Sequence, residues 1–386
     1  MKGIRTQKGL IKNLVHQKLN FPTFQDIPKK IAGRYTLYHA ESYNYYHEYA
    51  VPHDVHHYHD EKVIYILKNV SVWPNNSVVA IDRNTFIRDS AYSTHRLKKF
   101  IEKDQVKSKP VIHEDMPCVA IDGGEWNNYY HWHIDILPRL FGLYHPEIRR
   151  LETVKLYLSN KISDEYLRIV EKLVPANVEV ELYHEPLRIS AKTYIHLPYL
   201  TSEWDGHLPE DYLDFYRRSI FSMFDIKPDK SKQEKNIYIS RKYAHVRRII
   251  NEDALLSVIR DYGFEIYRLE YLTFRQQVEL FAQAGTVLAQ HGAGLTNILY
   301  SHNIKIIEIF SSNYPGVNHY RLLASSLNHQ YANMFADHDY RPDILQVPWK
   351  TKFKDEVIDK DIEIDVGRVE EKIRQVMCQE KWKYIG

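Results

Sequence analysis

Cysteine is scarce in this chain, long apolar runs are missing, and neither sign of charge dominates. Only two cysteines occur, Cys118 and Cys378, which excludes a disulfide framework and favours a reducing compartment. No apolar run reaches the length of about 18 residues that a membrane span needs, and the first 30 residues lack the apolar core of a signal peptide. The net charge of +2 gives no general case for nucleic acid as a partner. We therefore expect a cytoplasmic protein without a membrane anchor.

The first 30 residues are an exception to the charge balance, because they carry seven basic side chains against a single acid, Asp26. One interpretation is a peripheral contact with the inner face of a membrane or with another anionic partner. The alternative is a solvated basic tail.

Aromatic side chains are abundant within an otherwise ordinary globular composition. Hydrophobic residues make up 44% and charged residues 26% of the 386 residues, and this length allows two domains with a core each. Thirty tyrosines and six tryptophans are unusual, and planar rings with a polar edge suit a cleft that holds a sugar. Packing as half-buried residues explains most of them equally well.

The first half of the chain combines hairpins with an α/β pattern. Over 62–87, short β-rich runs are separated by turn residues such as Asn75-Asn76, which predicts antiparallel hairpins. Over 119–195, strand and helix patterns alternate as in one α/β domain. A helix is expected over 209–224, and the polar run over 227–235 is typical of a linker.

Beyond the linker, strands and helices alternate regularly over 236–334. Repeated βα units of this length predict a doubly wound parallel sheet, whose ligands bind at the carboxyl ends of the strands. We expect Asn251 to cap one helix, and Thr273 with Gln276 to form a capping box for the next. Apolar spacing over 366–377 predicts an amphipathic C-terminal helix that packs across both domains.

A turn of small residues, His291-Gly292-Ala293-Gly294, lies between two apolar strand patterns and opens a short helix. The glycines remove side-chain bulk where the backbone enters the helix. The N–H groups exposed there, together with the positive end of the helix dipole, can hold a phosphate. The alternative is a tight turn without a ligand.

A second motif covers residues 128–141. If this segment is helical, its polar side chains share one stripe: Asn128, His131, Asp135 and Arg139. An imidazole beside a carboxylate can take a proton from a hydroxyl group. An ordinary ion pair between Asp135 and Arg139 is the alternative. Pro138 favours a cleft, because the kink it causes costs about 3 kcal/mol in an ordinary helix interior.

A third motif is the basic loop over 240–252, which leaves the first strand of the second domain and enters its first helix. Arg241, Arg247 and Arg248 can neutralise a diphosphate in the same crevice as the glycine turn. A solvated basic loop is the alternative. Glu308, inside an apolar strand pattern, either accepts the ribose hydroxyls of a nucleotide or is a buried pair partner.

Two further patterns give weak evidence for a metal site. The histidines between His53 and His59 lack a cysteine and a regular helical spacing. Asp337-His338-Asp339 has the Asp-x-Asp spacing of metal-dependent transferases, but it lies beyond the nucleotide sheet and is short enough to occur by chance. We therefore expect no metal ion in the site.

Taken in order, these motifs resemble glycosyltransferase family 61 over about residues 60–335. The resemblance rests on 128–132 with Asp135 and 137–140, on the arginines of the basic loop with Asn251-Glu252, and on 291–297 with Ile307-Glu308. It implies a GT-B architecture, in which two Rossmann-like domains face each other across a cleft. It also implies inverting transfer from a UDP-sugar, such as UDP-N-acetylglucosamine or UDP-xylose, without a required cofactor or metal ion. Bacterial members act in capsule and surface-polysaccharide assembly on glycan or glycolipid acceptors.

The resemblance also assigns roles to residues of this chain. It implies that Asp135 is the catalytic base, with His131 orienting the acceptor hydroxyl or acting as the base itself. The donor-binding residues that it implies are Arg241, Arg247, Arg248, Asn251, Glu252, His291, Gly292, Ala293, Gly294, Asn297 and Glu308. The acceptor-binding residues that it implies are Asn128, Trp132, His133 and Arg139. His133 stands where apolar residues are common in the family, so acceptor contacts are expected to differ.

The domain organisation that follows has four segments. They are an N-terminal extension over 1–60, an α/β acceptor-side domain over 61–225, a nucleotide-sugar domain over 226–345, and a C-terminal tail and helix over 346–386.

Two other classes of protein are compatible with the same motifs. A nucleotide-sugar epimerase or a pyruvyl transferase also uses small-residue turns and arginines on this kind of fold. A non-enzymatic glycan-binding protein with a degenerate nucleotide site would bind a glycan but not UDP.

Overall fold

The structure, a computed structural model, describes residues 21–45, 55–82, 84–102, 110–121, 128–184, 186–201, 206–228, 234–311, 319–336 and 361–378. By its residue contacts, the chain divides into two compact units. The first unit comprises Met1–Glu41 and His59–Glu203, and the second comprises Ser42–Tyr58 and Trp204–Gly386. Within the described ranges, no helix combines the length and the apolarity that crossing a bilayer requires.

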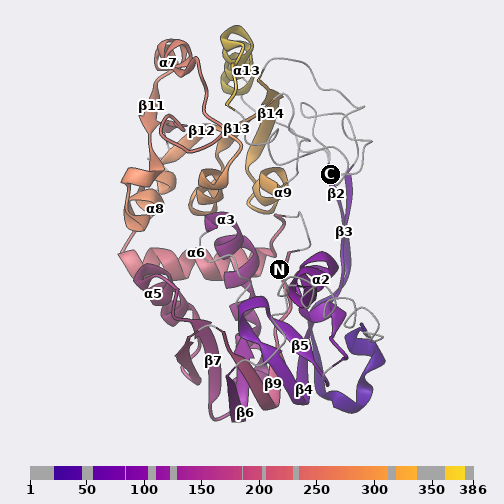
Figure 1. Cartoon of the computed structure of the whole chain (residues 1–386). Coiled ribbons are helices and arrows are strands. Elements are labelled where there is room, and N and C mark those ends of the chain that lie inside the picture. The colour runs from indigo at the N-terminus through magenta and orange to yellow at the C-terminus, as the bar shows by residue number, and fades with distance from the viewer. Residues whose placement is uncertain are drawn as a thin grey trace, which may run out of the picture. The chain divides into compact units, whose positions relative to one another are not determined.

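The first unit is built on a seven-stranded mixed sheet (Figure 1). Its order is β1-β4-β9-β6-β7-β8, and β5 pairs with β4 beside this path. β9, β6, β7 and β8 are parallel neighbours, whereas β1, β5 and β9 each pair antiparallel with β4. The strands are β1 Ile31–Tyr38, β4 Lys62–Trp73, β5 Val78–Ala80, β6 Val111–Ala120, β7 Val154–Ser159, β8 Val178–Tyr183 and β9 Arg188–His196.

Short helices connect these strands. They are η1 Phe24–Asp26, η2 Pro28–Lys30, η3 Pro74–Asn76, η4 Arg88–Ser90, α2 Thr94–Glu102, α3 Tyr129–His131, η5 Trp132–Ile136, η6 Leu137–Tyr144, α4 Pro146–Arg149 and α5 Asp164–Leu173. The alternation of strand and helix expected over 119–195 is therefore confirmed. α5 begins after Ser163, whose side chain accepts a hydrogen bond from the backbone N–H of Tyr166.

The expected hairpins are confirmed in part. β4 and β5 pair antiparallel through η3, at the Asn75-Asn76 turn. The two apolar runs on either side of Asn69, however, form one strand rather than two. Asn69 has a left-handed φ of 52°, a conformation that asparagine tolerates better than most residues and that lets the strand continue through it.

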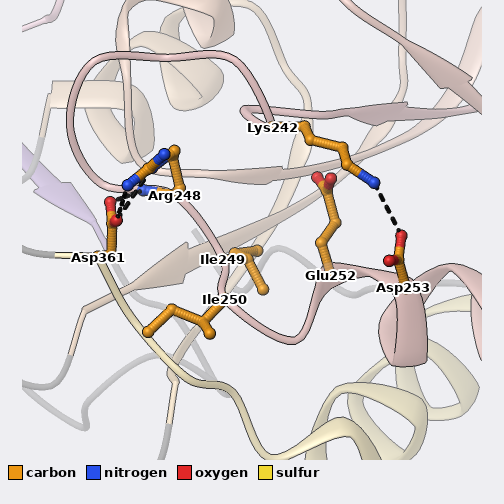
Figure 2. Close-up of a pocket in the computed structure, with 7 residues that line it drawn as sticks. All are labelled: Lys242, Arg248, Ile249, Ile250, Glu252, Asp253 and Asp361. Carbon is orange, nitrogen blue, oxygen red and sulfur yellow. Dashed lines mark hydrogen bonds and ion pairs between the residues drawn. The ribbon is translucent and has the colours of Figure 1, made fainter.

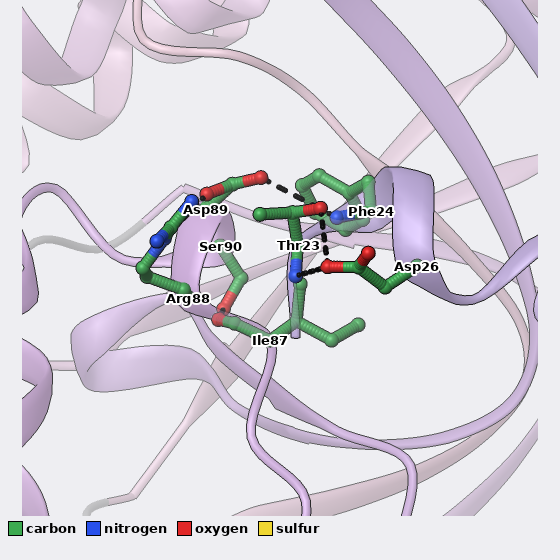
Figure 3. A network of polar contacts seen from close by, with 7 residues as sticks. All are labelled: Thr23, Phe24, Asp26, Ile87, Arg88, Asp89 and Ser90. Atoms are coloured by element: carbon green, nitrogen blue, oxygen red, sulfur yellow. Dashed lines mark hydrogen bonds and ion pairs between the residues drawn. The ribbon is translucent and has the colours of Figure 1, made fainter. Parts of the chain in front are cut away.

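A polar network ties the first described residues to η4 (Figure 3). The Asp26 carboxylate accepts hydrogen bonds from the backbone N–H and the hydroxyl of Thr23, each at 2.8 Å. The backbone N–H of Phe24 donates to Asp89 at 3.3 Å, while the Phe24 ring stacks on Tyr65 in the core. These contacts anchor the segment that leads into β1. The sequence patterns had not predicted a strand at β1.

The second unit is built on a five-stranded sheet in which every neighbouring pair is parallel. Its order is β11-β10-β12-β13-β14. The strands are β10 Lys235–Ile239, β11 Phe264–Tyr267, β12 Ala284–Gln290, β13 Lys305–Phe310 and β14 Gln330–Phe335. The parallel sheet predicted for this part of the chain is confirmed. A separate two-stranded sheet pairs β2 (Glu41–Tyr45) with β3 (Val55–His59).

Helices cover both faces of the parallel sheet. They are α6 Glu210–Phe224, α7 Glu252–Asp261, η8 Leu269–Tyr271, α8 Phe274–Ala282, η9 Ala293–Tyr300, α9 His319–Ser326 and α13 Val366–Cys378. Figure 1 shows α7 and α13 on one side of the sheet and α8 and α9 on the other. Leu255 of α7 and Ile373 of α13 share a buried core with Leu288 and Ile307 of the sheet. The sheet is thus doubly wound.

One predicted helix cap is confirmed and the other is wrong. Thr273 and Gln276 form the expected capping box at the start of α8. Asn251 does stand at the N-cap of α7, but its side chain makes no cap hydrogen bond. Instead its amide bonds both backbone groups of Ile364, donating to the carbonyl at 2.8 Å and accepting from the N–H at 3.0 Å. A contact 113 residues away thus replaces the local one.

The division into units differs in position from the predicted domain boundary at 225/226. α6 lies in the second unit, where the Tyr216 hydroxyl is 2.9 Å from that of Tyr300 in η9. α13 is present at the predicted place, and its described contacts are with α7, β13 and β14. Its packing across both domains stays a prediction.

Candidate active site

The predicted helix over 128–141 is present, but it changes type along its length. α3 ends at His131, η5 is π-helical from Trp132 to Ile136, and η6 is a 3-10 helix from Leu137. Pro138 explains the second change, because it has no N–H to donate to the preceding turn. π-helical segments within helices are frequent at functional sites, and this one contains Asp135.

His131 and Asp135 form a close pair on this helix. The Nδ1 atom of His131 lies 2.5 Å from Oδ2 of Asp135, and the hydroxyl of Thr201 donates to Oδ1 at 2.6 Å. The Asp135 side chain is only 3% exposed, whereas that of His131 is 24% exposed. Both carboxylate oxygens are therefore engaged inside the domain, and the imidazole is the group that a substrate can reach. A carboxylate at Nδ1 also keeps the proton there, which leaves Nε2 as an acceptor.

The other residues of the predicted stripe have different surroundings. Asn128 is the N-cap of α3, and its side chain accepts from the backbone N–H of His131. Arg139 is fully buried, and its guanidinium donates to the carbonyls of Leu197 and Ile121 and to the hydroxyl of Ser77. Asp135 and Arg139 therefore do not form the ion pair that was considered as the alternative.

Trp132 and His133 also lie within the core. The Trp132 ring stacks on Tyr166, with 4.8 Å between ring centroids. His133 contacts the rings of Tyr129 and Tyr166, and burial lowers the pKa of its imidazole to about 3. As they lie, Trp132, His133 and Arg139 pack inside the first unit, and their contact with an acceptor stays a prediction.

Two residues near His131 were missed by the sequence patterns. Thr201 is 66 residues from Asp135, so no local spacing could point to it. The ring of Tyr92 stands edge-on to His131 at 6.3 Å and to Tyr199 at 5.1 Å. The surroundings of the imidazole thus include aromatic rings, and a role of these rings in holding a sugar stays a prediction.

In the second unit, the basic loop and the glycine turn come together at the carboxyl ends of β10 and β12. Ile239 pairs with Ala289 at the end of these neighbouring strands. The chain passes from β10 to β11 on one side of β10 and later returns to β12 on its other side, so β10 and β12 stand at the switch point where doubly wound sheets bind their ligands. A Cβ atom placed on Gly292 would stand 2.5 Å from Nη1 of Arg241. Glycine at 292 thus lets the Arg241 guanidinium lie directly against the turn, and a larger residue would make this side chain shift.

Arg241 is fixed in this position by its own loop. Its guanidinium donates to the backbone carbonyl of Val246 at 3.1 Å and to that of Arg247 at 3.4 Å. Arg247 has a left-handed φ of 58°, which turns its carbonyl toward Arg241. A held guanidinium next to the start of η9 provides the positive potential that an anion needs.

Gly294 and Asn297 hold η9 in place. A Cβ atom on Gly294 would stand 3.0 Å from the side chain of Leu269, so glycine permits close packing against η8. The side-chain amide of Asn297 donates to the carbonyl of Gly294 at 3.1 Å and to Oε1 of Gln277 at 3.0 Å. Gln277 donates in turn to the carbonyls of Leu269 and Leu272, each at 3.1 Å. Asn297, expected at the donor, thus braces the turn, and Gln277 is a partner that no motif predicted.

Gln290 is a further residue that the sequence patterns missed. It ends β12 and is 4% exposed, and among the described residues neither polar atom of its side-chain amide has a hydrogen-bond partner. Leaving a buried polar group unsatisfied costs about 1–3 kcal/mol, so this amide at the carboxyl end of a parallel strand is available to bind a ligand or a water molecule.

His291 and Glu308 form a second buried imidazole–carboxylate pair. Nδ1 of His291 lies 2.5 Å from Oε1 of Glu308, and the Tyr331 hydroxyl donates to Oε2. Glu308 is fully buried, and its register partner Ala289 lies within β12. Of the two roles considered for Glu308, this arrangement is that of a buried pair partner, which orients His291.

Two other cations of the basic loop, Lys242 and Arg248, line a pocket of about 290 Å³ together with neighbouring acids (Figure 2). Its lining residues are Lys242, Arg248, Ile249, Ile250, Glu252, Asp253 and Asp361. Arg248 is paired with Asp361, and Lys242 lies 3.0 Å from Asp253. Glu252 accepts from the Tyr238 hydroxyl at 2.8 Å. Lys242 and Arg248 are therefore paired with acidic side chains. Arg241 instead donates to backbone carbonyls and lies against the glycine turn.

The two sequence patterns considered for a metal site lie wholly or partly outside the described residues, so the structure does not test them. Within it, no three His, Cys, Asp or Glu side chains are grouped so that they could hold a metal ion. His56, His57 and His59 belong to β3, while His53 lies outside the described residues. Asp337-His338-Asp339 also lies outside them.

The second unit is a doubly wound parallel sheet with a glycine turn beside Arg241, and the first is a mixed α/β unit with a partly exposed imidazole at His131. Residues 129–307 match the family model for Glycosyltransferase 61, and this part of the chain is accordingly a glycosyltransferase 61 domain. The match includes both the His131–Asp135 pair and the Arg241–Gly292 turn. Among curated proteins, none matches the chain.

Proposed function

We propose that this protein is an inverting glycosyltransferase that moves a sugar from a nucleotide-diphosphate donor, a UDP-sugar in the first instance, to a hydroxyl group of a glycan acceptor. The observation that carries the proposal is the family match over 129–307, which contains an accessible imidazole and a separate anion-binding turn. The proposal includes a GT-B arrangement, in which the two units face each other so that these sites share one substrate.

The diphosphate is proposed to bind at the carboxyl ends of β10 and β12. Arg241 and the N–H groups of Gly292, Ala293 and Gly294 would neutralise the charge that develops on the leaving diphosphate. His291, oriented by Glu308, lies at the start of the same turn. Arg247, Arg248, Asn251 and Glu252 would shape the loop around the donor.

His131 is proposed as the general base, with Asp135 as its positioning residue. Nε2 of His131 takes the proton of the acceptor hydroxyl while the oxygen of that hydroxyl attacks the anomeric carbon of the donor sugar. The bond from this carbon to the diphosphate oxygen breaks with inversion, and the diphosphate leaves with the electron pair. Asp135 keeps the imidazole oriented and stabilises the positive charge that it gains. The Asp135 side chain is only 3% exposed and both of its oxygens already have a hydrogen-bond partner, which favours His131 as the base.

The family supports a glycan acceptor, and we propose that the reaction belongs to surface-polysaccharide assembly at the inner face of the membrane. Basic residues among the first 30 would provide the peripheral contact. Asn128 and the tyrosines around His131 would border the acceptor.

The transfer is proposed to need no metal ion, because Arg241 and the backbone N–H groups can stabilise the leaving group. Turnover measured in EDTA and in added Mn²⁺ tests this point. Equal rates support the proposal, and loss of turnover in EDTA that Mn²⁺ restores contradicts it.

The donor class is tested by thermal shift against UDP-, GDP- and CMP-sugars, because a ligand that binds the native state raises its melting temperature. We expect a shift with one nucleotide class, and release of the nucleotide only when an acceptor glycan is present. An epimerase would convert the donor without an acceptor. A glycan-binding protein would show no shift with any nucleotide.

The base assignment predicts different effects for two substitutions. His131→Gln should lower kcat by about 10²–10⁴-fold, the contribution of a general base, and leave the donor Kd within about twofold. Asp135→Asn should lower kcat less, again with little change in donor Kd. Free imidazole should partly restore turnover to His131→Ala, an effect that a purely structural role would not produce.

His113→Gln is the matched control, since this histidine is exposed on β6 and away from the pair. Near-normal turnover of His131→Gln, together with a large loss in Asp135→Asn, would instead make Asp135 the base.

A further inference from the structure

Two exposed tyrosines stand beside the anion-binding turn of the second unit. Tyr243, in the loop after β10, is 57% exposed, and Tyr271, at the end of η8, is 67% exposed. Their ring centroids are 6.4 Å apart, and the Arg268 guanidinium lies 4.7 Å from the centroid of the Tyr243 ring. No other described tyrosine, phenylalanine or tryptophan is as exposed as either of them. Large aromatic surfaces left in water are a mark of a binding site.

Backbone contacts place this pair next to Arg241. The N–H of Ala244 donates to the carbonyl of Arg241 at 2.9 Å, so a tight turn carries Tyr243. The N–H of Ser240 donates to the carbonyl of Tyr267 at 2.9 Å, which joins the ends of β10 and β11. Tyr243 and Tyr271 thus stand above the carboxyl ends of β10 and β11, one strand away from the glycine turn on β12.

The brace made by Gln277 holds the two sites at a fixed spacing. Its side chain donates to Leu269 and Leu272, which flank Tyr271, and accepts from Asn297 of η9. Gly294, at the start of η9, packs against Leu269. The aromatic pair and the anion-binding turn therefore belong to one rigid part of the second unit.

From this arrangement we infer that Tyr243 and Tyr271 are the platform on which the base of the donor nucleotide stacks. The inference rests on the proposed function, and it extends that function by naming where the base lies. A ligand whose phosphates bind at Arg241 and Gly292 and whose planar ring lies over exposed aromatics is a nucleoside diphosphate. Arg268 covers one side of the Tyr243 ring, so the Tyr271 ring is the more open of the two. The guanidinium N–H groups of Arg268 can donate hydrogen bonds to the carbonyl oxygens of a base.

The test compares a ligand that has a base with one that has none. Binding of UDP, GDP and inorganic pyrophosphate is measured by calorimetry for the whole chain and for Tyr271→Ala, Tyr271→Phe and Tyr243→Ala. Stacking of a base on an aromatic ring predicts that Tyr271→Ala weakens nucleotide binding about tenfold, with pyrophosphate binding unchanged. Tyr271→Phe should keep the nucleotide affinity, because the ring and not the hydroxyl is used. Tyr243→Ala should show a smaller loss of the same kind.

Tyr144→Ala serves as a control, since it removes a partly exposed tyrosine of the first unit. Both Tyr243 and Tyr271 are exposed, so their variants should melt at the wild-type temperature. Nucleotide binding that is unchanged in both alanine variants overturns the inference and leaves the proposed function standing. Equal losses for nucleotide and pyrophosphate overturn it as well. If wild-type protein binds neither nucleotide nor pyrophosphate, the proposed function itself is overturned, and the inference about the tyrosines is overturned with it.

Discussion

At the scale of single residues, Gly292 shows how a small residue can allow a close contact without any backbone strain. Its φ of 168° is ordinary extended backbone, but an added Cβ atom would meet Nη1 of Arg241 at 2.5 Å. We predict that Gly292→Ala folds with a melting temperature close to that of wild type, because the far end of a flexible side chain can shift. Its affinity for UDP and for inorganic pyrophosphate should fall about tenfold, as expected when one charge-assisted contact of roughly 1.5 kcal/mol is lost. Calorimetry measures both ligands.

Gly367→Ala is the control for this substitution, since its Cβ atom would have only an ordinary 3.4 Å contact with Asp365. If Gly292→Ala binds pyrophosphate as tightly as wild type does, Arg241 is not part of the anion site.

At the scale of elements, the turn after β12 depends on a hydrogen-bonded brace from α8. Gln277 donates to two carbonyls next to η8 and accepts from Asn297 in η9. We predict that Gln277→Ala lowers the free energy of unfolding by about 1–3 kcal/mol, because buried partners lose their hydrogen bonds. It should also weaken nucleotide binding, since η8 and η9 are no longer held together. Urea denaturation and calorimetry check the two effects.

Arg275→Ala provides a matched comparison on the same helix. It removes an exposed pair with Glu279, which is worth a few tenths of a kcal/mol at most, and should leave nucleotide binding unchanged. Equal destabilisation by both variants would contradict the role of Gln277.

At the scale of the whole molecule, buried neutral histidines make stability depend on pH. Burial lowers the pKa of His133 and of His329 to about 3, and burial together with Arg139 lowers that of His196. An unfolded histidine has a pKa near 6.5, so below this pH the unfolded state binds more protons than the folded state does. The contribution of these histidines to the free energy of unfolding is therefore fully present above about pH 6.5, and it is lost as the pH falls toward 3. Each such histidine contributes a slope of up to about 1.4 kcal/mol per pH unit.

The measurement is urea denaturation at intervals between pH 7.5 and 5, a range in which most carboxylates keep their charge. His133→Phe should show a shallower slope than wild type for the first unit. A slope that does not change with this substitution would mean that His133 is not held neutral by the fold.

Much of the second unit could be predicted because its signals are local. Thr273 with Gln276 marks a helix start whichever fold surrounds it, and the apolar runs at 286–290 and 305–310 are strands with little alternative. Local spacing also brings His131 and Asp135 together, since residues four apart on a helix face the same side. Asn251 shows the limit, because a distant backbone segment at Ile364 outcompetes the local cap.

Local sequence patterns were enough to predict the α/β class, the parallel sheet of the second unit, the glycine turn and the His131–Asp135 pairing, because each depends on residues that are near one another in the chain. Tertiary structure alone decided which side chains are accessible and which are not. It buries Arg139 among carbonyls, holds Asp135 with Thr201, and places Arg241 over Gly292. The physical reason is that burial and hydrogen-bond partners come from strands and loops distant in sequence, where no spacing rule applies.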